Sequence, residues 1–478
     1  MTRLRDVAFW ACLCAVVLAS RLRHVSLLWS DEDYHLAAAI QVLHGKVPYR
    51  DFWYDKPPLN LLFYLLFGAH VGVALRAADT AFVCLCCILA YRFAASLWSK
   101  REGQVAAALL AFFLIFYLIP GVLPLEPDTL MLAPHLAAVY LAWRGKSLWA
   151  GIAAGIAFQL NVKGVFLLLL CPTSFGLLGF LIPNAVIFAW LAAAGTLPGY
   201  WEQVWKWGWL YASGPAAPAG LTSLLGWFGF HAALLIGAIW LWIRERSRML
   251  WWFLLALAVT MIGLRPAPRY FNLLLPPLVI AASGSGIFLS RKADDKKRTF
   301  ALVAVVAVCV MLAVPAVRFV RAYINPDSSG DTAMDRESRA AAALINTMAK
   351  ASDTIFVWGY RPDIFAYTRL SVAGRFSDSQ PLTGVPADRH LSSEEPVAYA
   401  STEQNRRELV KTSPSFLVDG LSQYNPRLDI HRYPELALWL SQYCEAARAG
   451  LTIVYRYCGP GRLRLTADPI RSPPPRAP

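Results

Sequence analysis

Carboxylates are crowded into one short hydrophilic stretch near the start of the chain. Asp31, Glu32 and Asp33 stand in a row soon after a long apolar segment, and Ser30 precedes them. Carboxylates can take a proton from a reacting group or bind a divalent cation. Carboxylates can also stabilise the first turn of a helix. If Ser30 is the N-cap residue, this structural role would account for one or two of the three acids. Three in succession exceed that need, so this stretch is a candidate site.

A second acidic stretch, Glu126-Pro127-Asp128, lies between two later apolar segments. The structural alternative is a pair of acids at a helix N-terminus around Pro127. Asp31, Glu126 and Asp128 could also converge as oxygen ligands of a divalent cation, although nothing in their spacing demands a metal.

Isolated cations form a complementary set. Lys56 follows Asp55 and precedes two prolines, Lys163 lies between two apolar segments, and Arg269 stands at the start of another. A cation near a bilayer is costly unless an anion satisfies it. The local alternatives are an ion pair of Lys56 with Asp55 and a structural role for Arg269 at its segment start.

The elements that must position these residues are membrane helices. The 478 residues are 57% apolar and 16% charged, with a mean hydropathy of +0.44. Long apolar runs with short basic connectors predict a polytopic α-helical membrane protein. The expected spans, eleven in number, are about 7–23, 77–98, 104–119, 128–143, 148–162, 164–177, 178–195, 222–243, 249–264, 270–290 and 299–318.

Basic connectors predict the orientation of these spans. If eleven spans alternate, the Lys and Arg clusters at 100–101, 144–146, 244–248 and 291–298 share one side with the basic N-terminus, so that side is cytoplasmic. Both acidic stretches and all three isolated cations then meet at the outer face. The first outer loop, about 24–76, is expected to hold interfacial helices, the first of them lying flat on the membrane.

Charges at the starts and ends of the spans have simpler explanations. Arg21 and Arg23 are expected to snorkel from the end of the first span. Arg76 and Asp79, three residues apart, are expected to pair locally.

The net charge of +14 does not indicate nucleic-acid binding. Residues 1–323 hold 27 basic and 14 acidic side chains, whereas residues 324–478 hold 18 and 17. The basic excess therefore lies between apolar segments, where membrane topology explains it.

Residues 324–467 change character. Apolar runs of strand length at 354–358, 416–419 and 451–455 alternate with helix-like stretches at 335–350, 402–411 and 434–447. This pattern predicts a small α/β domain outside the membrane, followed by a Pro-rich disordered tail at 468–478. Its two cysteines, Cys444 and Cys458, could form a disulfide there.

Several of these features, taken in order, resemble the GT-C glycosyltransferases. The branch resembled is the dolichyl-phosphate-mannose protein mannosyltransferase-like family, which includes bacterial lipid A aminoarabinose and galacturonosyl transferases. The similarity covers roughly residues 5–290. It is carried by Asp31-Glu32 after the first span, a flat helix, the Asp55-Lys56-Pro57-Pro58 turn, the second acidic loop, "GIAFQLNVKGVF" around Lys163 and "PAPRYFNLLLPPLVIAASG" around Arg269. One departure is Glu126-Pro127-Asp128, where relatives often carry Asp-Pro or Asp-Glu.

The resemblance implies a GT-C-type fold in the bacterial cytoplasmic membrane, with the C-terminal domain in the periplasm or outside the cell. It implies inverting transfer of a hexose or pentose from a polyprenyl-phosphate carrier to a hydroxyl of a protein, lipid or glycan. Asp31 would be the base, with Glu32 beside it, and Lys56, Lys163 and Arg269 would bind the donor phosphate. Glu126 and Asp128 would hold the acceptor or a divalent cation, and the supporting residues would be Asp33, Tyr54, Asp55 and Arg265.

Two alternatives belong to other classes. A transporter or flippase for a polyprenyl-linked lipid or glycan would carry charges near the midplane of several spans, or broken helices. A non-catalytic membrane scaffold would use only its tail to bind a partner. Charges gathered at one face argue against transport.

Overall fold

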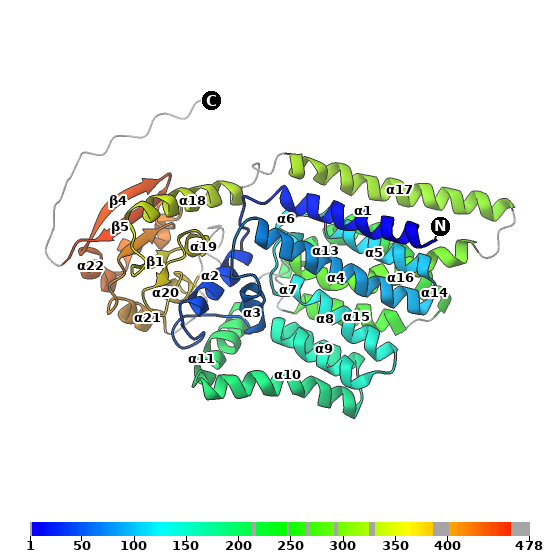
Figure 1. Ribbon diagram of the computed structural model, residues 1–478, viewed down its shortest axis with the longest axis horizontal. Coiled ribbons are helices and arrows are strands. Elements are labelled where there is room, and N and C mark those ends of the chain that lie inside the picture. The colour runs from blue at the N-terminus through cyan, green and yellow to red at the C-terminus, as the bar shows by residue number, and fades with distance from the viewer. Residues whose placement is uncertain are drawn as a thin grey trace.

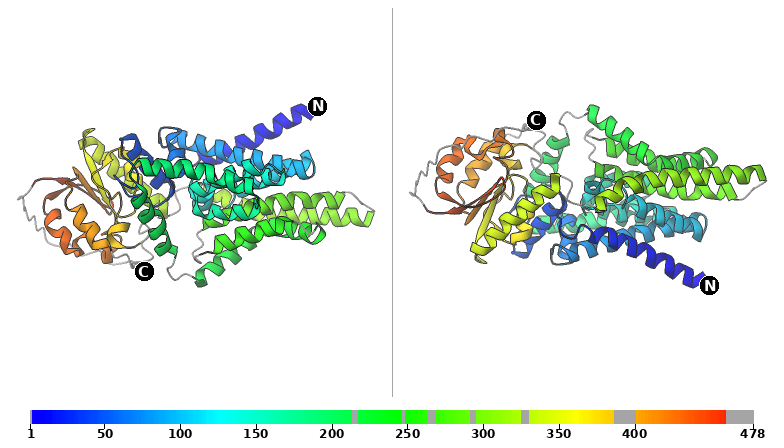
Figure 2. Two further views of the ribbon diagram at one scale, coloured as in Figure 1. Left: turned by 90° about the horizontal axis from the view of Figure 1, so that it is seen from below. Right: turned by 90° about the horizontal axis from the view of Figure 1, so that it is seen from above.

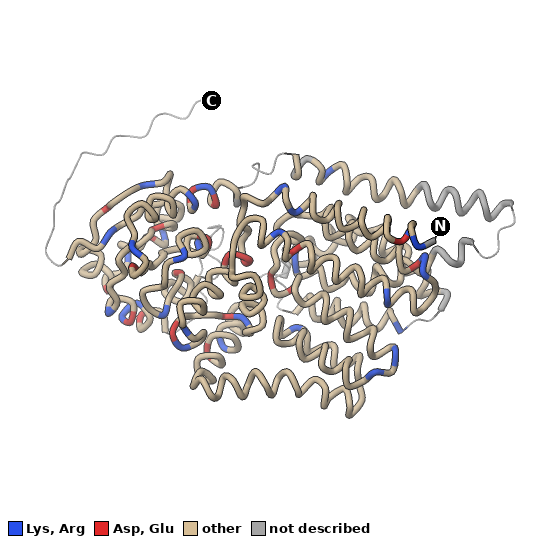
Figure 3. The backbone as a smooth tube through the Cα atoms, in the orientation of Figure 1, with Lys and Arg blue, Asp and Glu red and all other residues tan. Residues whose placement is uncertain are grey.

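The computed structural model describes residues 2–212, 217–245, 248–262, 268–290, 295–324, 330–385 and 401–459. A bundle of helices runs along the long axis of the molecule and meets a small α/β domain at the end opposite the N-terminus (Figure 1, Figure 2). Charged residues are sparse along the bundle and gather at its ends and in the α/β domain (Figure 3). This distribution fits a bundle surrounded by lipid, where charges are costly.

The bundle is built from apolar helices. Hydrocarbon offers no hydrogen-bond partners, so each segment forms a helix that satisfies its own backbone groups. They are α1 (Thr2–Leu22), α4 (Val73–Leu97), α5 (Lys100–Phe113), α8 (Leu132–Trp143), α9 (Ser147–Leu160), α10 (Ser174–Ala193), α13 (Ala217–Phe230), α14 (Ala232–Glu245), α15 (Arg248–Met261), α16 (Leu275–Ser290) and α17 (Asp295–Ile324).

The spans expected at 164–177 and 222–243 are not single α-helices in the structure. A nine-residue 3-10 helix, η1 (Val162–Leu170), takes the place of the first half of the span expected at 164–177. The span expected at 222–243 is divided into α13 and α14, which meet at an angle of 81°. Among the described residues, only α4 and α10 are long and apolar enough to cross a membrane alone, and the bent pair passes the same test together. The expected count of eleven spans is therefore not confirmed.

Helices α9 and α10 run in the same direction, so η1 must carry the chain back between them (Figure 1). Leu148 at the start of α9 meets Gly179, and Gln159 near its end donates a hydrogen bond of 2.7 Å to Asn184. A Cβ at Gly151 would lie 1.9 Å from the carbonyl oxygen of Gly176, so only glycine allows this approach. Small residues at such contacts are typical of membrane helix pairs.

Short elements lie between the bundle and the α/β domain. They are α2 (Glu32–Leu43), α3 (Leu59–Leu65), α6 (Ile119–Val122), α7 (Pro127–Leu130), α11 (Leu197–Tyr200), the π-helix η2 (Trp201–Lys206), α12 (Trp207–Ala212) and the 3-10 helix η3 (Pro268–Leu274). All residues of α2 from Glu32 to Gln41 are buried, so the apolar face that was expected to meet the membrane lies inside the protein. Leu36 and Ile40 of α2 lie in one cluster with Tyr64 and Leu125, whereas Ala37 and Ala38 on the other side cluster with residues of the C-terminal domain.

The C-terminal domain is built on a five-stranded sheet of order β2-β1-β3-β5-β4. Strand β1 is parallel to β2 and β3, whereas β5 is antiparallel to β3 and β4. The strands are β1 (Thr354–Trp358), β2 (Ser371–Val372), β3 (Phe416–Asp419), β4 (Tyr443–Ala449) and β5 (Thr452–Tyr457). The helices are α18 (Gly330–Met348), α19 (Asp363–Thr368), α20 (Gln380–Thr383), α21 (Thr402–Leu409), η5 (Pro426–Leu428), η6 (Ile430–Arg432) and α22 (Pro434–Leu440).

The three expected strands of this domain are found as β1, β3 and β5, but the helix expected at 434–447 is wrong in its second half. Helix α22 ends at Leu440, and the following residues form strand β4. Gly450, at φ +58°, turns the chain directly into β5. Pairing with β5 therefore decides the structure here over the local helix preference.

A disulfide joins Cys444 in β4 to Cys458 just after β5. We expect protein isolated without reductant to show neither thiol to an alkylating reagent under denaturing conditions. Replacing both cysteines by serine should destabilise the domain by about 3 kcal/mol, because the bond closes a loop of ordinary length. The measurement is alkylation followed by mass spectrometry, with the buried Cys86 as the internal control for complete labelling. Full labelling of the pair before reduction would contradict the bond.

Candidate active site

An arginine joins the two acidic stretches of the sequence. Arg269 Nη1 lies 2.5 Å from Asp31 Oδ2, and its Nε lies 3.9 Å from Glu126 Oε2. Arg269 belongs to η3, Asp31 precedes α2, and Glu126 precedes α7. Three segments remote in sequence thus meet between the bundle and the C-terminal domain, as the predicted topology requires.

Asp31 has a backbone conformation that L-residues rarely adopt, with φ 76° and ψ −40°. Such a residue costs of order 1–3 kcal/mol, and it persists only where its surroundings impose it. Asp31 is the N-cap residue of α2, yet its side chain makes no capping hydrogen bond. Capping therefore does not explain this carboxylate, which is directed to Arg269 instead.

In the second acidic stretch, Glu126 caps a helix and Asp128 forms an ion pair. Glu126 caps α7 by accepting hydrogen bonds of 3.0 Å from the N–H groups of Asp128 and Thr129. Burial raises the pKa of Glu126 to about 8, helped by the charge of Asp128 and opposed by Arg269. Asp128 turns the other way, and its Oδ1 lies 2.8 Å from Lys163 Nζ.

Lys163 is held on two sides. Besides Asp128, its Nζ lies 3.4 Å from the ring centroid of Tyr270, a cation–π contact. Tyr270 follows Arg269 directly, so one turn of η3 supplies both the ion-pair partner of Asp31 and the ring beside Lys163. Tyr270 was not among the sequence candidates, although it stands in the Arg-Tyr motif that carried the resemblance.

Lys56 is paired with Asp55, with 2.7 Å between Nζ and Oδ2, and its side chain is 39% exposed. Burial opposes its charge, but Asp55 and then Asp31 raise the pKa of Lys56 above its ordinary value. Lys56 therefore remains a cation within electrostatic reach of Asp31. Nearby Tyr54 is buried, and its hydroxyl lies 2.7 Å from His35 Nδ1, so it packs α2 rather than facing the site.

Glu32 does not share the position of Asp31. Its two carboxylate oxygens lie 2.6 and 3.0 Å from Arg76, and both side chains are fully buried. The local pair expected between Arg76 and Asp79 is wrong: Asp79 pairs instead with Arg21, at 2.9 Å and also fully buried. Arg21 therefore does not snorkel.

The remaining candidates are placed as follows. Asp33 is buried and accepts a hydrogen bond of 2.8 Å from the N–H of Tyr34. Arg265 lies outside the described residues.

The described residues hold no group of three or more His, Cys, Asp or Glu side chains that could bind a metal ion. Two carboxylates expected to converge on a cation are already paired, Asp31 with Arg269 and Asp128 with Lys163. A divalent cation would have to displace these side chains, so the arrangement does not fit one and no step below runs through a metal.

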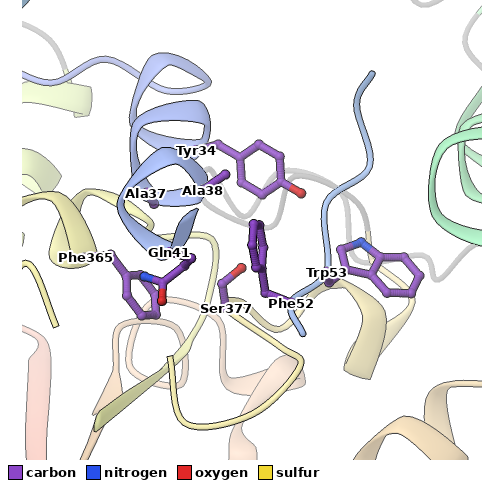
Figure 4. Close-up of a pocket in the computed structure, with 8 residues that line it drawn as sticks. All are labelled: Tyr34, Ala37, Ala38, Gln41, Phe52, Trp53, Phe365 and Ser377. Atoms are coloured by element: carbon purple, nitrogen blue, oxygen red, sulfur yellow. The ribbon is translucent and has the colours of Figure 1, made fainter. Parts of the chain in front are cut away.

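A small cavity lies between α2, the first outer loop and the C-terminal domain (Figure 4). It is lined by Tyr34, Ala37, Ala38 and Gln41 of α2, by Phe52 and Trp53 of the first outer loop, and by Phe365 and Ser377 of the C-terminal domain. Its mostly apolar walls include none of the ion-pair residues. It marks the seam between the domains rather than a reaction site.

Comparison with solved structures finds proteins of the same fold. The chain is similar to ArnT from Cupriavidus metallidurans bound to undecaprenyl phosphate, with 16% identity over 94% of this chain and 97% of that chain, at a TM-score of 0.57. The apo form of that protein matches with 14% identity, 95% and 98% coverage and the same TM-score of 0.57.

A more remote likeness is to the oligosaccharyltransferase from Archaeoglobus fulgidus in its apo form. It has 12% identity, covers 91% of this chain and 71% of that chain, and has a TM-score of 0.50. No protein-family model matches the sequence, and no curated protein matches it. At these identities the likeness establishes the fold, and the chemistry has to be argued from the site.

Proposed function

We propose that this protein is an inverting glycosyltransferase that uses a polyprenyl-phosphate-linked sugar as donor. The observation that carries the proposal is the ion pair of Asp31, whose backbone is strained, with Arg269. Glu126 lies next to Arg269, and Asp128 pairs with Lys163. The candidate site therefore contains a base and several cations. The fold shared with a structure that holds undecaprenyl phosphate supports the class of carrier.

In the proposed reaction, the acceptor hydroxyl attacks the anomeric carbon while Asp31 takes its proton. The bond between that carbon and the phosphate oxygen breaks, and the lipid phosphate leaves with the electron pair. A single displacement of this kind inverts the anomeric centre, and its transition state is oxocarbenium-like. The acceptor is a hydroxyl of a protein, lipid or glycan, and the sugar is a hexose or pentose.

The cations serve the leaving phosphate. Arg269 lies between the carboxyl groups of Asp31 and Glu126, so an incoming phosphate can compete for a guanidinium that is already positioned. Lys163 and Lys56 add positive charge to the site, and fixed cations stabilise the negative charge that develops as the bond breaks. Glu126 and Asp128 hold Arg269 and Lys163 in place and border the space for the acceptor.

Location and domain limits follow from the same proposal. Residues 1–323 would form the catalytic membrane domain in the bacterial cytoplasmic membrane, and residues 324–467 a domain on its outer side. The disulfide between Cys444 and Cys458 supports an oxidising compartment for that domain.

Transport has one structural feature in its favour, because η1 and the bent pair of α13 and α14 are interrupted spans. Transporters use such breaks to bind substrate near the midplane. Here the ion pairs of the candidate site join segments at one end of the bundle, so glycosyl transfer explains more of the structure.

A deletion strain tests the proposal. We expect it to accumulate a polyprenyl-phosphate sugar and to lose one modification from its envelope glycans, lipids or proteins, both measured by mass spectrometry. Purified protein in nanodiscs should transfer the sugar from that lipid extract to envelope material of the same strain. An unchanged lipid pool and unchanged envelope would contradict the proposal.

Lys56→Ala tests the phosphate contact. We expect the variant to need about tenfold more lipid extract for half-maximal transfer, because one charge-assisted contact to phosphate is lost. Folding should be little affected, since the lysine is partly exposed. Arg50→Ala, which removes an exposed pair with Asp51 in the same loop, is the matched control. Equal lipid requirements in both variants would remove Lys56 from the phosphate site.

A further inference from the structure

We propose that Tyr360 of the C-terminal domain is a positioning residue of the active site. Its hydroxyl holds Asp31 in place when Arg269 turns to the leaving phosphate. The inference rests on the proposed function and deepens it, because it makes the C-terminal domain part of the reaction site.

The two oxygens of Asp31 face different parts of the molecule. Arg269 from η3 occupies Oδ2 at 2.5 Å, and the hydroxyl of Tyr360 donates to Oδ1 at 3.4 Å. The second contact is long for an O–H···O bond, as is common for catalytic contacts before substrate binds. It can shorten when the stronger pull of Arg269 is withdrawn.

The sheet of the C-terminal domain fixes where Tyr360 stands. Strand β1 is followed by Gly359 and then by Tyr360. Gly359 has a φ of +110°, which favours glycine, and its N–H donates a hydrogen bond of 2.9 Å to Ser379 Oγ. On its other side, Arg361 is fully buried and donates to Ser338 Oγ at 2.9 Å and to the Met334 carbonyl at 2.6 Å. Tyr360 is therefore fixed on both sides by buried hydrogen bonds.

Contacts between aromatic rings connect Tyr360 to the first outer loop and α2. The Tyr360 ring lies 5.7 Å from that of Tyr34, which stacks on Tyr54 at 5.4 Å and 18°. Burial, followed by the charges of Asp31 and Asp33, raises the pKa of the Tyr360 hydroxyl well above its ordinary value. The hydroxyl thus stays protonated and able to donate.

The seam itself is held through backbone groups. The side chain of Gln41 in α2 accepts a hydrogen bond of 2.8 Å from the N–H of Val372. It also donates a hydrogen bond of 3.3 Å to the Leu370 carbonyl. Trp53 N–H donates 2.6 Å to the Arg375 carbonyl. These bonds flank the small cavity of Figure 4, where Tyr34 and Ser377 lie on its two sides. Such contacts leave little freedom for the domain to slide away from Asp31.

The consequence concerns the moment of transfer. When the phosphate engages Arg269, Oδ2 of Asp31 is released from the guanidinium and can take the proton of the acceptor. The same release allows the carboxylate to rotate away from the attacking hydroxyl. Tyr360 on Oδ1 prevents this rotation and favours the ionised carboxylate.

The test compares Tyr360→Phe with Tyr424→Phe in nanodiscs, using the polyprenyl-phosphate sugar extracted from the deletion strain and its envelope material. Tyr424 also donates from this domain to a carboxylate, Glu337, at 2.7 Å, but away from Asp31. For Tyr360→Phe we expect kcat to fall about tenfold with an unchanged lipid requirement, the loss of one hydrogen bond to a charged group. The acid limb of its pH–kcat profile should move up, because the ionised base loses a donor.

Three results would overturn the inference: an unchanged kcat, an unmoved acid limb, or an equal loss in Tyr424→Phe. If Tyr360→Phe unfolds, fluorotyrosine at position 360 keeps ring and hydroxyl, and as a stronger donor it should move the acid limb down; an unmoved limb refutes the role. A wild-type rate in Asp31→Asn would instead refute the proposed base, so the two failures are distinguishable.

Discussion

Asparagine in place of Asp31 should lower the turnover of sugar transfer by about 10²–10⁴-fold, the usual contribution of a general base. Asparagine has nearly the same shape but cannot take the proton of an acceptor hydroxyl. It also tolerates a positive φ better than most residues, so the strained backbone at 76° is preserved. The loss should therefore report on chemistry rather than on folding. The measurement is the initial rate with lipid and envelope fractions of the deletion strain.

Binding of undecaprenyl phosphate separates the two possible causes of such a loss. We expect Asp31→Asn to bind this lipid at least as well as the parent, because Arg269 is released from its carboxylate partner. Asp51→Asn, in the same loop and on the surface, is the matched control and should change the rate less than twofold. Transfer that survives in Asp31→Asn would exclude the proposed base.

The sequence could predict that residues far apart in the chain meet at one face of the membrane domain. Lipid excludes charge, so charges that membrane topology does not require are confined to one face, and alternating spans bring separated loops to that face. The meeting of Asp31, Glu126 and Arg269 follows from this rule without any knowledge of contacts. The same rule does not say which acid pairs with which cation.

The pairs differ from those expected because buried charges find partners in three dimensions. Spacing along a helix favoured Arg76 with Asp79, yet Arg76 reaches across to Glu32 and leaves Asp79 to Arg21. A surface helix would have tolerated the local pair, but full burial requires every charge to be matched. We therefore propose that Glu32, a catalytic candidate in the sequence, positions the start of α2 through its pair with Arg76.

Tyr360 carried no signal in the sequence. It is one of 19 tyrosines and lies more than 300 residues from Asp31 in the chain. Its importance depends on how the C-terminal domain docks on α2, and no local pattern encodes that docking. Strand β4 was missed for a related reason, since its pairing with β5 outweighs a helix-like local composition.

Glutamine in place of Glu32 should destabilise the protein by about 3–5 kcal/mol, because it leaves Arg76 charged and unpaired in a fully buried site. Glutamine keeps the size of the side chain and one acceptor oxygen, so the missing charge accounts for the effect. Thermal unfolding in nanodiscs measures it. Glu403→Gln, which breaks an exposed pair with Arg407, should change stability by less than about 0.5 kcal/mol.

A double variant completes this test. Combining Glu32→Gln with Arg76→Met removes both charges and should recover much of the lost stability, because an apolar side chain replaces a buried cation. If the pair only positions α2, transfer should return together with stability. If Glu32→Gln instead folds with wild-type stability and still loses transfer, Glu32 takes part in the chemistry, and the strained Asp31 beside it does not act alone.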